Sequence, residues 1–160
     1  MRAFVGLGSN LGDGPGMVRA AVAEMDRHDS IHVVRVSSLY RSAAWGRADQ
    51  PDFTNAVAEL ETGLSPQDLL AVLLDTELHL GRERNSVRWS PRIIDIDLLC
   101  CGQYVSRRPD LELPHPRMHL RAFVLVPLLE LDPDLVIPGI GSVRSCLDRL
   151  ETQDIQRLEN

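Results

Sequence analysis

The chain has 160 residues, close to the commonest length of a single domain, and a chain of this length can bury about 70% of the surface that its unfolded form exposes. Its 17 basic residues, all arginine, are outnumbered by 23 Asp and Glu, and the formal net charge of −6 argues against a surface that binds duplex nucleic acid or anionic membranes. Three cysteines without a C-x-x-C spacing indicate neither a disulfide framework nor a zinc site. We therefore expect one cytoplasmic domain over residues 1–160, with no signal peptide and no membrane span.

The first third of the chain alternates between strand and helix patterns. Residues 3–8 (AFVGLG) form a short apolar run followed by turn formers, which predicts a buried strand. A helix is expected next, with Pro15 near its start and apolar residues at helical spacing as far as Met25. Residues 31–40 and 53–61 alternate in polarity and predict two more strands, separated by a long loop.

The clearest helix follows the third predicted strand. Ser65 as N-cap and Pro66 at the first helical position mark its start, and Gly81 is expected to end it. Residues 82–92 (RERNSVRWSPR) carry five charges and a proline without apolar periodicity, so they predict a loop. Residues 93–100 (IIDIDLLC) predict the last strand of the series.

The order β-α-β-β-α-β predicts an α+β fold. It is typical of a ferredoxin-like two-layer sandwich, in which an antiparallel sheet carries helices on one face. Residues 103–160 would add a proline-rich C-terminal extension with short helices and further strands. No internal repeat or linker divides the chain.

Two aspartates in the last predicted strand give the first chemical signal. Asp95 and Asp97 fall on the same face of that strand, about 6.6 Å apart along it at ~3.3 Å per residue. Like charges on one strand face repel each other, so a cation is expected nearby. Divalent metal ions could share both carboxylates, or the face could be solvated and balanced by Arg88 or Arg92. The spacing alone leaves both interpretations open.

Arginines gather in the predicted loop directly before this acidic pair, at positions 82, 84, 88 and 92. A guanidinium group binds phosphate oxygens in a bidentate manner, and Mg²⁺ is commonly held by one or two carboxylates together with substrate phosphates. The basic loop and the acidic pair together therefore indicate a site for a nucleotide polyphosphate. The alternative is a solvated run of charges.

Other motifs near the two ends of the chain are less specific. Gly6, Gly8 and Gly12 are spaced G-x-G-x-x-x-G, one residue too long for a dinucleotide-binding fingerprint. No G-x-x-x-x-G-K-[ST] is present, which excludes a P-loop. His115, in a rigid P-H-P segment, is better suited to contacting a phosphate than to joining His119 in a zinc site.

The few aromatic residues carry more information than usual. Phe53 and Phe123 would ordinarily be core residues. Phe53 shares a strand face with Asn55, however, and a ring beside an amide also suits a pocket for a flat heterocycle, because the amide both donates and accepts hydrogen bonds. The sequence leaves both interpretations open.

Four separated segments, in the same order, resemble a known family. They are GLGSNLGD at 6–13, QPDFTNAV at 50–57, RWSPRIIDIDLL at 88–99 and LPHPRMHLRAFVLVPL at 113–128. The chain resembles the 6-hydroxymethyl-7,8-dihydropterin pyrophosphokinases, which transfer a diphosphate from ATP to the hydroxymethyl group of a reduced pterin in folate biosynthesis. The resemblance implies a ferredoxin-like scaffold and two magnesium ions.

The resemblance also implies a role for each matching residue. Asp95 and Asp97 would bind both magnesium ions, and Arg82 and Arg92 would join them in catalysis. The residues implied to bind ATP are Glu77, Arg82, Arg84, Arg88, Arg92, His115 and Arg121. The residues implied to bind the pterin are Ser42, Ala43, Trp45, Phe53, Asn55, Trp89, Asp95 and Phe123. Among these, Phe53 and Phe123 would sandwich the pterin ring, and Trp89 would cap the pocket.

Three positions depart from the family pattern. They are Ser90, Leu74 and Trp45, and they affect the expected loop behaviour and adenine contacts rather than the reaction. Two alternatives from other classes are a non-catalytic nucleotide sensor and an RNA-binding module on the same scaffold. The acidic pair with its arginines disfavours the first, and the net charge of −6 disfavours the second. We expect a monomer that acts on small molecules.

Overall fold

The computed structural model describes residues 1–10, 13–43, 52–84, 94–151 and 155–158, and the side chains of 82–84 lie outside this description. Its centre is a six-stranded sheet with the strand order β10-β3-β4-β1-β5, in which β2 also pairs with β4. All of its pairings are antiparallel. The strands are β1 (Arg2–Ser9), β2 (Ile31–Val36), β3 (Tyr40–Ser42), β4 (Phe53–Thr62), β5 (Asp95–Cys101) and β10 (Ile155–Arg157).

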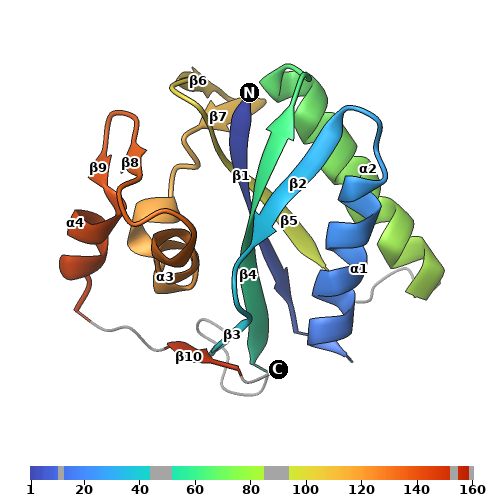
Figure 1. The fold of residues 1–160 in the computed structure, drawn as a ribbon, viewed down its shortest axis with the longest axis horizontal. Helices are drawn as coiled ribbons and strands as arrows, with labels where there is room; N and C mark the ends of the chain where they lie inside the picture. The colour runs from blue at the N-terminus through green and yellow to red at the C-terminus, as the bar shows by residue number, and fades with distance from the viewer. Residues whose placement is uncertain (11–12, 44–51, 85–93, 152–154, 159–160) are drawn as a thin grey trace.

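Helices α1 (Gly14–Asp26) and α2 (Pro66–Arg84) cover one face of this sheet (Figure 1). Ala3, Val5 and Leu7 of β1 point toward these helices and belong to the same buried cluster as the apolar residues of α1 and α2. The predicted ferredoxin-like α+β core, with the order β-α-β-β-α-β, is therefore confirmed.

The starts of α1 and α2 are capped by side chains, and the start of α2 agrees with the sequence prediction, whereas its end does not. The Asp13 side chain caps α1 by accepting a hydrogen bond from the Gly16 N–H at 2.9 Å. Ser65 Oγ caps α2 in the same way, accepting from the Asp68 N–H at 3.1 Å, which confirms the predicted start. The prediction that Gly81 ends α2 is wrong, because the helix continues to Arg84. Its last three residues are good helix formers, which explains why one internal glycine is tolerated.

The single strand expected over 31–40 is interrupted at Ser37. The Ser37 N–H donates to the Val57 carbonyl at 2.9 Å, and Ser37 Oγ accepts from the Val57 N–H at 2.9 Å. The hydroxyl thus replaces a backbone carbonyl in the ladder, a known way in which serine competes with regular pairing. The chain forms two strands, β2 ending at Val36 and β3 beginning at Tyr40.

The C-terminal extension supplies a second layer of helices, which the sequence did not place. Helices α3 (Ala122–Leu131) and α4 (Val143–Asp148) lie on the other side of the sheet from α1 and α2 (Figure 1). Phe4, Val57 and Leu99 of the sheet pack with them in a second buried cluster. The remaining elements of the extension are β6 (Ser106–Arg108), β7 (Leu111–Leu113), the 3-10 helix η1 (Met118–Leu120), β8 (Val136–Ile137) and β9 (Gly141–Ser142).

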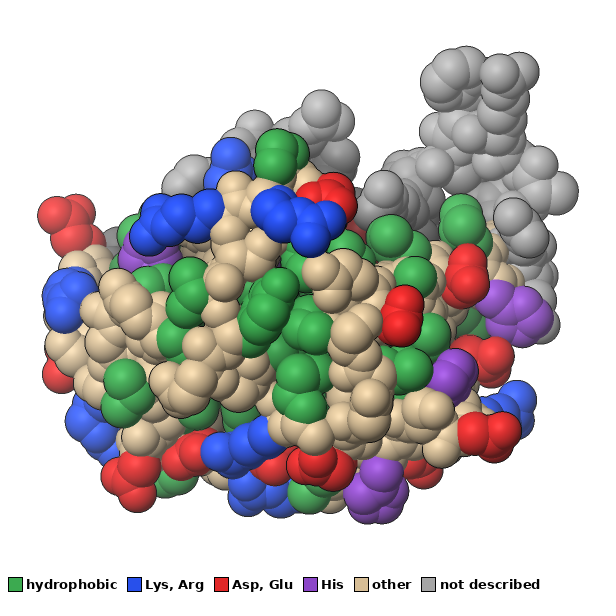
Figure 2. Space-filling model, turned by 90° about the horizontal axis from the view of Figure 1, so that it is seen from above, with side chains coloured by type: hydrophobic (Ala, Val, Ile, Leu, Met, Phe, Trp, Pro, Cys, Tyr) green, Lys and Arg blue, Asp and Glu red, His purple; other side chains and the backbone are tan. Residues whose placement is uncertain are grey.

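The exposed surface of the described residues shows no single dominant charge in the view of Figure 2. Acidic and basic side chains are mixed along the edge of that face, and hydrophobic side chains are exposed between them. Within the described ranges, no helix is both long enough and apolar enough to cross a membrane.

Candidate active site

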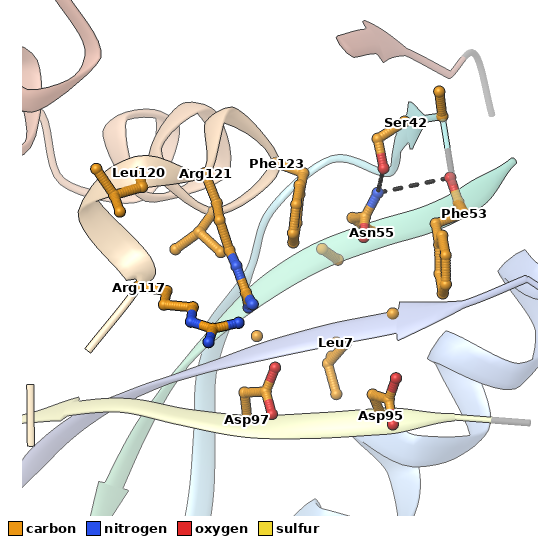
Figure 3. A pocket seen from close by; sticks show the side chains of 15 residues that line it. Leu7, Ser42, Phe53, Asn55, Asp95, Asp97, Arg117, Leu120, Arg121 and Phe123 are labelled. Atoms are coloured by element: carbon orange, nitrogen blue, oxygen red, sulfur yellow. Dashed lines mark hydrogen bonds between the residues drawn. The ribbon is translucent and has the colours of Figure 1, made fainter. Parts of the chain in front are cut away.

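A pocket of about 420 Å³ opens on the face of the sheet that α3 covers. This volume lies within the range of small-molecule sites. Its walls come from β3, β4, β5 and the segment from the start of η1 to the first turn of α3, and its floor is the second half of β1 (Figure 3). Segments from residue 6 to residue 124 therefore contribute to one cavity.

Gly6 and Gly8 lie in the floor of the pocket, where any side chain would reduce its volume. In the antiparallel registers, Gly8 lies between Asn55 of β4 and Asp95 of β5, while Gly6 lies opposite Asp97. A Cβ atom added to Gly8 would come within 3.3 Å of Asn55 Oδ1. Gly8 thus keeps the space between the Asn55 amide and the Asp95 carboxylate open.

The acidic pair lies on the pocket face of β5, as the alternation predicted. Asp95 and Asp97 both line the cavity, whereas Ile96 between them packs into the core beneath α1 and α2. Asp97 is exposed and Asp95 is half-buried. Both side chains offer only oxygen ligands, which is the chemistry that Mg²⁺ prefers.

Glu77 of α2 supports the acidic pair from outside the pocket. One of its carboxylate oxygens, Oε2, accepts a hydrogen bond from the backbone N–H of Ile96 at 2.6 Å. β1 is the only described neighbour of β5 in the sheet, so this bond satisfies an N–H on the strand's other edge. Glu77 does not line the pocket, and a direct contact between Glu77 and ATP stays a prediction.

His115 lies beside Asp97 in the turn that precedes η1. Burial lowers the pKa of His115 more than the nearby Asp97 carboxylate raises it, and the positive charges of Arg121 and Arg117 lower it further. The His115 Nδ1 atom accepts a hydrogen bond from the Arg117 N–H at 3.1 Å. The neutral ring therefore carries its proton on Nε2, which leaves that N–H available to a ligand.

Two arginines form the wall opposite the carboxylates. Figure 3 shows the side chains of Arg117 and Arg121 directed into the cavity toward Asp97. The guanidinium carbon of Arg121 lies 5.5 Å from the centre of the Phe123 ring, which holds this group by a cation–π contact. The pocket thus places positive groups across from negative ones.

The other end of the pocket carries two aromatic rings and a buried amide. Phe53 and Phe123 lie on either side of Asn55 in Figure 3. Asn55 is buried, and its Nδ2 donates to Ser42 Oγ at 2.6 Å and to the Phe53 carbonyl at 3.5 Å. Its Oδ1 accepts no hydrogen bond from the described residues, so it can accept one from a ligand.

The structure brings together eight of the residues implied by the sequence. The pocket is lined by Ser42, Ala43, Phe53, Asn55, Asp95, Asp97, Arg121 and Phe123. Phe53 and Phe123 both line this cavity and are partly exposed. Phe123 also packs against the second buried cluster, so it combines a position in the pocket with core packing. The predictions for Trp45, Arg88, Trp89, Ser90 and Arg92 fall outside the described residues, as do those for the side chains of Arg82 and Arg84.

Some pocket residues were not predicted from the sequence. Gly6 and Gly8 were considered only as part of a nucleotide-binding motif, and their register opposite the aspartates could not be read from their spacing. Arg117 and Leu120 lie in the segment that resembles the family, yet they gave no signal of their own. Leu74, which departs from the family pattern, is exposed on α2 and does not line the pocket.

The chemistry of this pocket is typical of enzymes that transfer phosphoryl groups. Two carboxylates can bind divalent cations, and two guanidinium groups can neutralise phosphate oxygens. His115 lies near Asp97 but does not line the cavity itself, so its contact with ATP stays a prediction. Within the described part of the chain, no group of three or more His, Cys, Asp or Glu side chains forms a metal site by itself. Substrate phosphates and water would then complete the coordination of an ion held by Asp95 and Asp97.

Comparisons with known proteins agree with this assignment. Residues 4–133 match the family described as 7,8-dihydro-6-hydroxymethylpterin-pyrophosphokinase (HPPK). A 2-amino-4-hydroxy-6-hydroxymethyldihydropteridine pyrophosphokinase from Methylorubrum extorquens is 47% identical over 159 residues, with 99% of each chain covered. One from Pseudomonas aeruginosa is 43% identical over 157 residues, covering 98% of this chain and 96% of the relative.

Solved structures share the fold. A crystal structure of HPPK-DHPS in complex with substrates aligns with a TM-score of 0.74 at 11% identity, and it covers 99% of this chain. Wild-type Plasmodium falciparum HPPK-DHPS with pterin and p-hydroxybenzoate aligns with a TM-score of 0.74 at 12% identity over 98% of this chain. This chain spans 46% of the length of either solved chain.

The chain belongs to the 7,8-dihydro-6-hydroxymethylpterin-pyrophosphokinase family. It is accordingly a diphosphokinase of folate biosynthesis, as the four sequence segments had indicated.

Proposed function

We propose that the protein transfers the terminal diphosphate of ATP to the hydroxymethyl group of 6-hydroxymethyl-7,8-dihydropterin in this pocket. Residues 1–160 would carry out this reaction as one cytoplasmic, monomeric domain. The observation that carries the proposal is the arrangement of the pocket. The acidic pair of β5 and the arginine wall share one cavity with two phenylalanine rings and a buried amide.

In this proposal the pterin occupies the aromatic end of the pocket. Its ring would stack between Phe53 and Phe123, because flat heterocycles pack well against aromatic faces. Asn55 Oδ1 would accept a hydrogen bond from an N–H of the pterin, and the bond from Asn55 to Ser42 fixes the amide in the required orientation. The backbone of Ala43, with Trp45 beyond it, would complete the contacts at the ring's edge.

The phosphates of ATP would lie between the carboxylates and the arginines. His115 and Arg121 would bind phosphate oxygens, joined by Arg82, Arg84, Arg88 and Arg92 from the segment before β5. Asp95 and Asp97 would hold two Mg²⁺ ions, which neutralise and orient the polyphosphate when bound. Trp89 would close over the pterin, and Glu77 would keep Asp95 and Asp97 in position through Ile96.

The chemical step is a displacement at the β-phosphorus of ATP. The hydroxyl oxygen of the pterin forms a bond to this phosphorus and loses its proton to solvent. The bond between the β-phosphorus and the bridging oxygen to the α-phosphate breaks, and AMP leaves with the electron pair. Such transfers require little covalent chemistry from the protein, so positioning and charge neutralisation supply most of the acceleration.

One incubation tests the proposal. The protein is mixed with MgATP and 6-hydroxymethyl-7,8-dihydropterin, and the release of AMP and of the pterin diphosphate is followed by chromatography. A matched reaction with 6-methyl-7,8-dihydropterin, which lacks the acceptor hydroxyl, should release no AMP. AMP formed equally in both reactions would instead indicate ATP hydrolysis, and no AMP in either would indicate a nucleotide-binding protein without turnover.

A further inference from the structure

Arg117 lies in the pocket although no motif predicted it there. It stands at the start of η1 and lines the same wall as Arg121. Figure 3 shows both side chains extending from this wall toward Asp97 of β5. Arg117 therefore reaches the part of the cavity in which the proposed phosphates would lie.

The backbone at Arg117 is held in place on both sides. Its N–H donates to His115 Nδ1 at 3.1 Å, and its carbonyl accepts from the Leu120 N–H at 3.0 Å. The His115 N–H in turn donates to the Leu99 carbonyl at 2.7 Å, which ties this turn to β5. Met118, the next residue, is fully buried. The backbone position of Arg117 is thus fixed, and only its exposed side chain has to be ordered when a ligand binds.

The guanidinium group of Arg117 has no bonding partner among the described residues. Within the described part of the chain, its side chain makes no hydrogen bond and no ion pair, and only its backbone is bonded. Other arginines differ, since Arg108 pairs with Asp110 at 2.7 Å and Arg2 pairs with Glu59 at 3.1 Å. None of the described residues occupies the N–H donors of Arg117, so they can bind a ligand.

The described charges in the pocket balance in pairs. Asp95 and Asp97 supply two negative charges, and Arg117 and Arg121 supply two positive ones. ATP with two divalent cations carries little net charge, so it would enter a site whose described charges cancel. Arg117 would add positive charge beside Arg121 on this wall, together with the arginines proposed from the segment before β5.

We propose that Arg117 is a further phosphate-binding residue of this pocket, and that with Arg121 it binds the polyphosphate of ATP from the wall opposite Asp95 and Asp97. This inference rests on the proposed function of the site. A guanidinium presents several N–H donors in a planar fork and binds phosphate oxygens in pairs, whereas lysine would supply only the charge.

The test compares three variants with the unmodified protein. Arg117→Gln removes the charge, Arg117→Lys keeps it, and Arg144→Gln is the matched control because Arg144 is exposed on α4 outside the pocket. Affinity for the Mg²⁺ complex of α,β-methylene-ATP, which cannot transfer its diphosphate, is measured by titration calorimetry. Adenosine serves as a ligand without phosphates, and AMP release gives kcat and the KM for ATP and for the pterin.

Arg117→Gln should weaken binding of the ATP analogue about tenfold and raise the KM for ATP, a loss typical of one charged hydrogen-bonding partner. Its affinity for adenosine, its KM for the pterin and its melting temperature should stay unchanged. Arg117→Lys should fall between Arg117→Gln and the unmodified protein, and Arg144→Gln should show no change.

Two outcomes would overturn the inference. The first is undiminished affinity of Arg117→Gln for the ATP analogue, and the second is an equal loss for adenosine, which would indicate a structural role. An unmodified protein that binds the analogue but releases no AMP would contradict the proposed function instead, and the affinity comparison would still decide the role of Arg117.

Discussion

Glu77 Oε2 accepts a hydrogen bond from the Ile96 backbone N–H at 2.6 Å, and Ile96 is the residue between Asp95 and Asp97. A carboxylate on α2 thereby fixes the edge of the strand that carries both proposed metal ligands. Hydrogen bonds to charged groups contribute about 1.5–3 kcal/mol, so the effect on strand position is substantial.

Removing this bond should disturb the metal site without removing a ligand. Glu77→Ala should lower the free energy of unfolding by about 1–3 kcal/mol and raise the Mg²⁺ concentration needed for half-maximal AMP release. Glu77→Gln keeps an acceptor and should retain most of the activity. Glu151→Ala is the matched control, because Glu151 is exposed and does not line the pocket. A variant whose ATP affinity falls while its Mg²⁺ dependence is unchanged would favour the direct ATP contact instead.

The two aspartates should be individually essential. Asp95→Asn and Asp97→Asn each preserve shape but remove a charged ligand, so each should reduce the rate at least about a hundredfold, since 1.36 kcal/mol corresponds to a factor of ten. The measurement is AMP release at saturating Mg²⁺, with circular dichroism to verify folding. Retention of most of the turnover in either variant would contradict the assignment of these residues as shared metal ligands.

A methyl group added at Gly8 should weaken pterin binding without destabilising the fold. In Gly8→Ala the new Cβ atom would lie 3.3 Å from Asn55 Oδ1 and 3.9 Å from the Phe53 ring, in the space proposed for the pterin. We expect pterin affinity to fall about tenfold or more while the affinity for α,β-methylene-ATP stays within a factor of about two. Gly63→Ala is the matched control, because nothing lies within 4 Å of its new Cβ atom. Equal losses for both ligands would mean that the substitution distorts β1.

Truncation of Phe53 and truncation of Phe123 should have different effects on ligand affinity. Phe53→Ala should weaken pterin binding by about 0.5–1.5 kcal/mol beyond the lost contact area and leave nucleotide affinity unchanged. Phe123→Ala should weaken both ligands, because the Arg121 guanidinium lies 5.5 Å from the Phe123 ring centre and would lose this support. Calorimetric titration of each ligand tests both variants. Nucleotide affinity unaffected by Phe123→Ala would show that the contact does not position Arg121.

Tyr40 should make the stability of the protein depend on pH in the alkaline range. Its hydroxyl donates to Glu130 Oε1 at 2.6 Å, and burial together with this bond raises the pKa of Tyr40 to about 12 from 10.0. The folded state thus favours the neutral phenol, so this contribution to stability is complete below pH 10 and is lost as the pH rises through 12.

The difference in unfolding free energy between the unmodified protein and Tyr40→Phe isolates this group from the two buried cysteines that titrate in the same range. Tyr40→Phe should be less stable by about 1–3 kcal/mol at pH 7. The difference should shrink between pH 10 and pH 12 in urea titrations. A difference that stays constant over this interval would show that the Tyr40 phenol has an ordinary pKa.

The sequence by itself determined the family and the core fold, and it placed the acidic pair. Period-two alternation placed Asp95 and Asp97 on one strand face, and the capping residue Ser65 located the start of α2, because both signals depend only on local backbone geometry. Because these signals are local, two of the predicted element boundaries were wrong. Gly81 favours a helix end but does not enforce one, and the break at Ser37 depends on Val57, a residue of another strand.

Only the tertiary structure decided which distant residues form the pocket. Gly8 becomes a pocket floor because β1 runs between β4 and β5, and this register is a property of the sheet rather than of the glycine. Glu77 meets Ile96 because α2 packs beside the edge of β5. Arg117 reaches the site because the C-terminal extension covers the second face of the sheet. Burial and register arise from contacts between segments far apart in the chain, which local patterns do not encode.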